Sequence, residues 1–126
     1  MIRLQHHKGL GGSAYVYLLK KSDAAAVKKT LLSINGVDSV LTKEQAAKDY
    51  QLMPDRIGDF MVLGDINTVF GELPDSAHEQ LPATYRSHGS TYEARVPLFI
   101  YNAKYAPPAY YFDFNYKLAA WLFGKP

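Results

Sequence analysis

Strand-like and helix-like segments alternate through the first half of this chain. A β-branched and aromatic run over residues 14–19 precedes a segment of helical spacing over residues 24–32, which Ser22 or Asp23 can cap. A second strand-like segment follows at residues 37–41. Because strand, helix and strand occur in this order, the pattern predicts a split βαβ, ferredoxin-like arrangement.

The next segments continue the alternation. Thr42 and Gln45 have the spacing of a capping box, which predicts the start of a helix over residues 43–50. An apolar run between two Gly-Asp pairs, residues 58–65, is typical of a buried strand. We expect residues 68–71 to return onto that strand as a hairpin.

The second half is less regular. Residues 72–90 are polar and long for a structureless connection, so we expect them to be functional or partly ordered. Residues 96–101 are strongly apolar and predict another strand, and Asp113 can cap a last helix over residues 114–123. The whole order predicts one α/β (α+β) domain over residues 1–126, in which helices pack on a mixed sheet.

The composition excludes several classes of protein. The chain has no cysteine, so it can have neither a disulfide framework nor a thiolate metal site nor a cysteine nucleophile. Its Lys and Arg residues are scattered and the net charge is only +2, so we expect no nucleic-acid partner. No apolar run is long enough to span a membrane, and the N-terminus does not have the pattern of a signal peptide. The cellular compartment stays open.

Two groups of residues have an ordinary structural interpretation. Gly9, Gly11 and Gly12 precede a strand and lack the Gly-Lys-Ser/Thr ending of a phosphate-binding loop, so we interpret them as a flexible lead-in. Asp59 and Asp65 flank the buried strand beside glycines. They could be metal ligands, but the turn interpretation is favoured.

The four histidines are candidate metal ligands. His88 stands in the polar loop of residues 86–89, just before the apolar strand, and metalloenzymes often hold an imidazole on a short loop braced by a sheet. His6 and His7 are adjacent, so on an extended segment they point to opposite sides and cannot easily bind one ion together. We interpret them as solvated or near a site, and His78 as a surface residue.

Several short motifs, in their order along the chain, resemble the C-terminal part of the type I phosphodiesterase/nucleotide pyrophosphatase group of the alkaline phosphatase superfamily. Within that group the chain is most similar to the phosphonoacetate hydrolases. The motifs that carry the resemblance are residues 6–13, residues 36–41, residues 55–59, Arg86-Ser87-His88-Gly89, Glu93 and Val96-Pro97.

The resemblance implies a site with two zinc ions held by Asp and His ligands, and a Thr or Ser nucleophile that attacks a phosphate ester or a phosphonate. It implies that His88 is the last histidine ligand, and that His6, His7, Arg86 and Glu93 lie near the site. In the family the nucleophile and the other ligands precede the position of His6, and they have no counterpart in this sequence.

We therefore expect a C-terminal segment of a larger hydrolase, with a cap-like α/β part over about 8–72 and a metal-loop, strand and helix part over about 73–126. The rest of the catalytic domain would be its partner, and the segment alone is expected to be inactive. A free-standing, non-catalytic ferredoxin-like binding module is the alternative. A small self-sufficient metallohydrolase is disfavoured, because four scattered histidines form no ligand cluster.

The C-terminal region is rich in aromatic residues, and two interpretations of them stay open. They can form a packed core. They can also form a surface made to contact a missing domain, which would make the chain prone to self-association.

Overall fold

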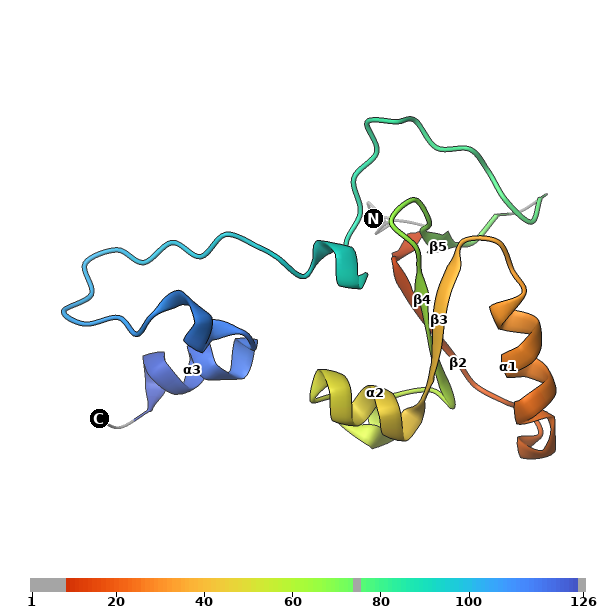
Figure 1. Cartoon of the computed structure of the whole chain (residues 1–126), viewed down its shortest axis with the longest axis horizontal. Coiled ribbons are helices and arrows are strands. Elements are labelled where there is room, and N and C mark those ends of the chain that lie inside the picture. The colour runs from red at the N-terminus through yellow and green to blue at the C-terminus, as the bar shows by residue number, and fades with distance from the viewer. Residues whose placement is uncertain (1–8, 74–75, 125–126) are drawn as a thin grey trace, which may run out of the picture. The chain divides into compact units, whose positions relative to one another are not determined.

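The structure is a computed structural model that describes residues 9–73 and 76–124 (Figure 1). The chain divides into two compact units, one that ends at Val96 and one that begins at Pro97. Each unit is described by itself below. The predicted division of the chain near residue 72 stays a prediction.

The first unit is built around a three-stranded sheet. Its strands are β2 (Ser13–Val16), β3 (Val37–Thr42) and β4 (Phe60–Gly64), in the order β2-β4-β3, and β4 is antiparallel to both neighbours. Both outer strands therefore run in the same direction, and α1 (Ala24–Leu32) connects them. This is the split βαβ arrangement that the sequence predicts, and the α+β fold class is confirmed (Figure 1). The prediction of a mixed sheet is wrong, because every strand pairing among the described residues is antiparallel.

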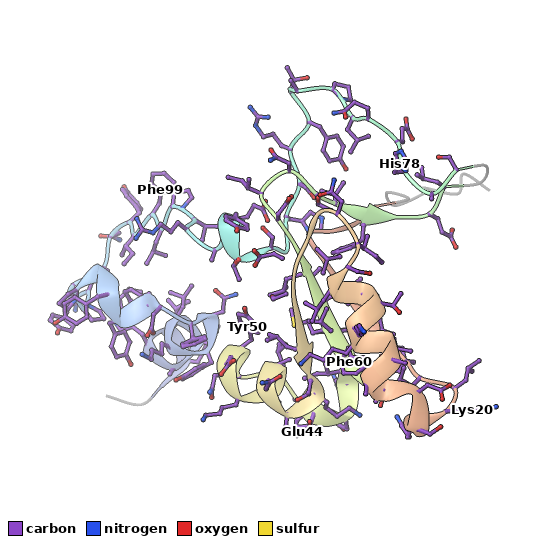
Figure 2. The ribbon with its side chains drawn as sticks, turned by 45° about the vertical axis from the view of Figure 1, so that its right-hand side comes forward. Lys20, Glu44, Tyr50, Phe60, His78 and Phe99 are labelled. Atoms are coloured by element: carbon purple, nitrogen blue, oxygen red, sulfur yellow. The ribbon has the colours of Figure 1, made fainter. Side chains whose placement is uncertain are left out.

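The central strand β4 supplies most of the core, because all five of its residues are buried. Successive side chains point to opposite faces of a strand. Phe60 and Val62 accordingly pack with residues of α1 on one face (Figure 2). Met61 and Leu63 pack on the other face, against Ala46 of α2 (Lys43–Tyr50). Each large apolar side chain buried in this way contributes about 1.5–3 kcal/mol.

Both predicted helices of this unit are confirmed. The α1 helix spans the predicted residues, although Asp23 at its N-cap makes no side-chain capping bond. At the start of α2, the Gln45 amide donates to Thr42 Oγ1 at 3.3 Å and the Thr42 amide donates to Gln45 Oε1 at 2.9 Å. The capping box is therefore present, and α2 ends at Tyr50, followed by the C-cap residue Gln51 with a left-handed φ of 55°.

Strand β2, which corresponds to the first predicted strand, is shorter than predicted. It ends at Val16, and the prediction that it extends to residue 19 is wrong. Beyond the end of the ladder, the amide of Leu18 donates to Asp59 Oδ2 at 2.7 Å instead of to a strand. Asp59 also pairs with Lys21, and this bond, followed by the Leu18 amide, lowers the pKa of the Asp59 carboxyl. These contacts fit the structural interpretation of Asp59.

The predicted hairpin is wrong. β5 (Phe70–Gly71) does not pair with β4 but with β1 (Gly9–Gly11), in a separate two-stranded sheet. The cause is topological, because β2 and β3 already occupy both edges of β4. The turn after β4 is held locally, since Asp65 Oδ1 accepts from the amide of Asn67 at 2.9 Å.

The predicted strand at residues 96–101 is also wrong. The structure assigns no strand to these residues, and several side chains are almost fully exposed, with Val96 at 73%, Phe99 at 89% and Tyr101 at 96%. A strand needs a partner for its backbone hydrogen bonds. Among the described residues no strand pairs with this segment, which explains why a strongly strand-forming sequence stays unpaired.

The second unit contains α3 (Asn115–Phe123), preceded by a short 3₁₀ helix. The prediction that Asp113 caps this helix is wrong, because the N-cap is Phe114 and makes no side-chain capping bond. Asp113 instead forms an ion pair with Lys117, four residues later, at 2.6 Å.

The aromatic residues of the second unit are partly packed and partly exposed. Phe112 and Trp121 meet edge to face with ring centroids 5.5 Å apart. Tyr110 and Phe123 are more than 80% exposed. Both interpretations of the aromatic region, a packed core and a contact surface, therefore stay open. None of the helices described here is long and apolar enough to cross a membrane.

Candidate functional site

The loop that carries His88 lies against the start of strand β2. The amide of Gly12 donates to the carbonyl oxygen of His88 at 2.7 Å. The carbonyl of the same Gly12 accepts from the amide of Gly64, at the end of β4, at 2.9 Å. One residue thus connects the His88 backbone to the central strand of the sheet. The loop is braced by β2 and β4, and not by the apolar segment after it as the sequence indicated.

Two glycines make this close approach possible. A Cβ atom on Gly11, which has a φ of +86°, would lie 2.5 Å from the carbonyl oxygen and 3.1 Å from Nδ1 of His88. A Cβ atom on Gly12 would lie 2.5 Å from the Cβ of Ser90. Any side chain larger than hydrogen would therefore displace the loop. We call this arrangement, Gly11 and Gly12 under residues 88–90, the glycine seat.

The loop is closed at its other end by Ser90 and Glu93. Ser90 is buried, and its amide and hydroxyl both donate to Glu93 Oε2, at 2.8 and 2.5 Å. The amide of Tyr92 donates to Ser90 Oγ at 3.1 Å, so the short 3₁₀ helix Thr91–Glu93 begins with a capping box. The Ser90 hydroxyl and then the Ser90 amide lower the pKa of the Glu93 carboxyl.

The other residues predicted near the site differ in their placement. Arg86 binds the backbone of its own loop, since Nη1 donates to the carbonyls of Ala83 and Tyr85 at 3.2 and 2.8 Å. Both Arg86 and His88 are exposed. His6 and His7 lie outside the described residues.

His78 lies away from this loop in sequence and is exposed, as expected of a surface residue (Figure 2). Its backbone carbonyl accepts a hydrogen bond from the hydroxyl of Ser76 at 2.7 Å. It is the natural comparison for His88, because both are exposed histidines in polar stretches of the same unit.

The loop fits one metal ligand but does not form a complete metal site. His88 presents an exposed imidazole on a backbone that is hydrogen-bonded to Gly12, and imidazole is a good ligand for zinc. Among residues 9–73 and 76–124, no three His, Asp or Glu side chains converge on a point that could hold a metal ion. A catalytic zinc needs about three protein ligands. The described residues can thus supply one ligand of such a site.

Sequence reasoning singled out His88 and Glu93 but missed the glycine seat and the Ser90–Glu93 capping box. The signal for the capping box is present, because Ser90 and Glu93 have the spacing Ser-x-x-Glu. The glycine seat has no local signal, since it depends on contacts between residues about 77 positions apart in the case of Gly11 and His88.

The chain was compared with known families and structures. No family model matches it. Two solved structures of phosphonoacetate hydrolase from Sinorhizobium meliloti 1021 are similar to it. The complex with phosphonoacetate is 33% identical over 65% of this chain and 20% of that chain, with a TM-score of 0.54. The complex with phosphonoformate is 36% identical over 48% of this chain and 15% of that chain, with a TM-score of 0.46.

The matched region thus spans about a fifth of the length of the solved hydrolase. Identity of 33% and a shared fold occur together in the complex with phosphonoacetate, so the likeness is not one of architecture alone. The resemblance that the sequence motifs indicate is confirmed: this chain is similar, in sequence and in fold, to a segment of phosphonoacetate hydrolase.

Proposed function

We propose that this chain is the C-terminal segment of a zinc-dependent hydrolase of phosphonates or phosphate esters, in which His88 binds one of two metal ions. The observation that supports this most is the fixed presentation of His88. Its backbone is bonded to Gly12 and seated on two glycines, while its imidazole is exposed. A loop that only connects two segments does not need such a seat.

The likeness to a solved phosphonoacetate hydrolase supports the class of substrate. That enzyme was solved with phosphonoacetate bound, and this chain is 33% identical to a part of it. When bound, zinc would act as a Lewis acid toward a phosphoryl oxygen. The part of His88 would be to bind and orient the ion, while the nucleophile and the other ligands would come from the rest of the catalytic domain.

Product release tests this proposal, measured as phosphate from phosphonoacetate and as 4-nitrophenolate from 4-nitrophenyl phosphate esters. The 126-residue chain and the complete reading frame that contains it are incubated with ZnCl₂ and either phosphonoacetate or 4-nitrophenyl phosphate esters. The complete protein should hydrolyse one of these substrate classes in a reaction that EDTA abolishes, and the 126-residue chain should be inactive. Zinc-dependent turnover by the 126-residue chain alone would show that it is not merely a segment. An inactive complete protein would contradict the hydrolase proposal.

The non-catalytic binding module remains the second candidate. What favours it is the first unit, which has a core on each face of its sheet and therefore does not depend on the second unit for burial of β4. The same assay separates the two candidates, because a binding module predicts release of neither phosphate nor 4-nitrophenolate by either protein.

A further inference from the structure

The contacts around His88 form a continuous chain that ends at one carboxylate. The His88 carbonyl accepts from the Gly12 amide, and Gly12 lies against Ser90 so closely that a Cβ would come within 2.5 Å of the Ser90 Cβ. Ser90 in turn donates twice to Glu93, at 2.8 and 2.5 Å. The position of the loop on the sheet is thus linked to the side chain of Glu93.

We propose that Glu93 is the positioning residue of His88: its carboxylate fixes Ser90 in the glycine seat and thereby fixes the backbone from which the imidazole projects. Glu93 has no role in chemistry in this proposal, because it acts only through Ser90. The proposal rests on the proposed function insofar as His88 is a ligand that needs positioning, but the contacts that it invokes exist in the chain itself.

Two observations favour positioning over ordinary loop packing. Ser90 is the one buried polar residue in the described part of the first unit, so its two donors must be satisfied inside the protein. Both donate to the same oxygen of an ionised carboxylate, and such charge-assisted bonds are shorter and stronger than neutral ones.

The alternative anchor for the loop is weaker. Arg86, on the other side of His88, binds only the carbonyls of Ala83 and Tyr85, which belong to the same exposed stretch. It therefore ties the loop to itself and not to the sheet. Ser90, by contrast, lies directly on the glycine seat, and Glu93 holds it there.

The test uses the ¹⁵N-labelled 126-residue chain without metal. Two quantities report on the loop: the order parameter of the His88 amide and the hydrogen-exchange rate of the Gly12 amide, which donates to His88. In Glu93→Ala, we expect the His88 order parameter to fall from about 0.85 to below about 0.6. We expect the Gly12 amide to exchange about tenfold faster, as the loss of one buried, charge-assisted hydrogen bond predicts.

The conservative variant Glu93→Gln should rescue part of the effect. Its amide oxygen can still accept from Ser90 but carries no charge, so both quantities should lie between those of the wild type and those of Glu93→Ala. Glu79→Ala is the matched control, because Glu79 is an exposed carboxylate in the same polar stretch and makes no side-chain contact with this loop among the bonds described. It should leave both quantities unchanged.

Two results would overturn the proposal. One is a Glu93→Ala protein whose His88 order parameter and Gly12 exchange rate equal those of the wild type. The other is equal acceleration of exchange at Gly12 and at Val62 in the core of β4, since this would mean that Glu93 stabilises the whole unit and does not position the loop.

A metal measurement separates this proposal from the proposed function. In the complete protein, loss of a residue that orients a ligand typically lowers metal affinity 10- to 100-fold, and Glu93→Ala should do so. If Glu93→Ala frees the loop while His88→Ala leaves the zinc content unchanged, the positioning of His88 stands and its role as a metal ligand fails. If Glu93→Ala leaves the loop ordered while His88→Ala loses zinc, the positioning fails and the proposed function stands.

Discussion

At the scale of single residues, the main finding is that two glycines and the helix-capping Ser90 hold an exposed histidine in place. Gly11 and Gly12 allow the loop to approach the sheet more closely than any other residue type would. Glu93 and Ser90 then keep it there. The functional candidate, His88, is thus defined less by its own contacts than by the backbone that presents it.

The glycine seat predicts that a methyl group added at Gly12 lowers the free energy of unfolding. In Gly12→Ala, the new Cβ would collide with that of Ser90, so we expect a loss of about 1–3 kcal/mol in the free energy of unfolding, measured by urea denaturation. Ser90→Gly removes the nearest atom that it would meet, although the amide nitrogen of residue 90, at 2.9 Å, stays. The cost of Gly12→Ala should therefore be smaller in the Ser90→Gly background than in the wild type. If Gly12→Ala lowers the free energy of unfolding equally in the two backgrounds, the collision with the Cβ of Ser90 is not the cause of the destabilisation.

Glu93 also predicts a pH dependence. Its pKa in the folded chain is lowered from the ordinary 4.5, chiefly by the Ser90 hydroxyl and amide. The bonds to Ser90 therefore stabilise the loop fully above pH 4.5, and this contribution is lost as the pH falls through the lowered pKa. The ¹⁵N shift of the Ser90 amide should titrate with a midpoint below 4.5 in the wild type and lose that transition in Glu93→Gln. A wild-type midpoint at or above 4.5 would contradict the assignment.

At the scale of elements, local signals predicted the helices well and the strand pairings poorly. The Thr42–Gln45 spacing predicted where α2 begins, because a capping box is formed by residues three apart. The partner of β5 could not be found in this way. It depends on β4 having both edges occupied, which only the whole sheet determines. The same holds for residues 96–101, whose strand-like composition says nothing about whether an edge is available.

The capping box of α2 predicts how a Thr→Ala substitution at its N-cap changes the melting temperature, compared with a Thr→Ala substitution inside α1. Thr42→Ala removes the oxygen that accepts from the Gln45 amide, and loss of such a cap costs about 1 kcal/mol, so the melting temperature should fall by several degrees. Thr30→Ala is the matched control, because Thr30 is exposed within α1 and alanine is the better helix former. It should leave the stability unchanged or raise it slightly. Equal destabilisation by both variants would argue against the cap.

At the scale of the whole molecule, the chain spans about a fifth of the solved hydrolase that it resembles. The sequence motifs were sufficient to predict this resemblance and to single out His88. They could not predict how His88 is held, because the seat joins residues from the start of the sheet to residues far along the chain. His88 is one candidate ligand on a fixed loop, and no three His, Asp or Glu side chains of the described residues converge on a point that could hold a metal ion.

The most direct test of this account is the zinc content of the complete protein, measured by elemental analysis for the wild type, His88→Ala and His78→Ala. The His88 backbone carbonyl, which binds Gly12, is retained in His88→Ala, so the loop should stay in its seat while the imidazole is lost. We predict close to two zinc ions per chain in the wild type and in His78→Ala, and at least one fewer in His88→Ala. The same zinc content in all three proteins would contradict the assignment of His88 as a metal ligand.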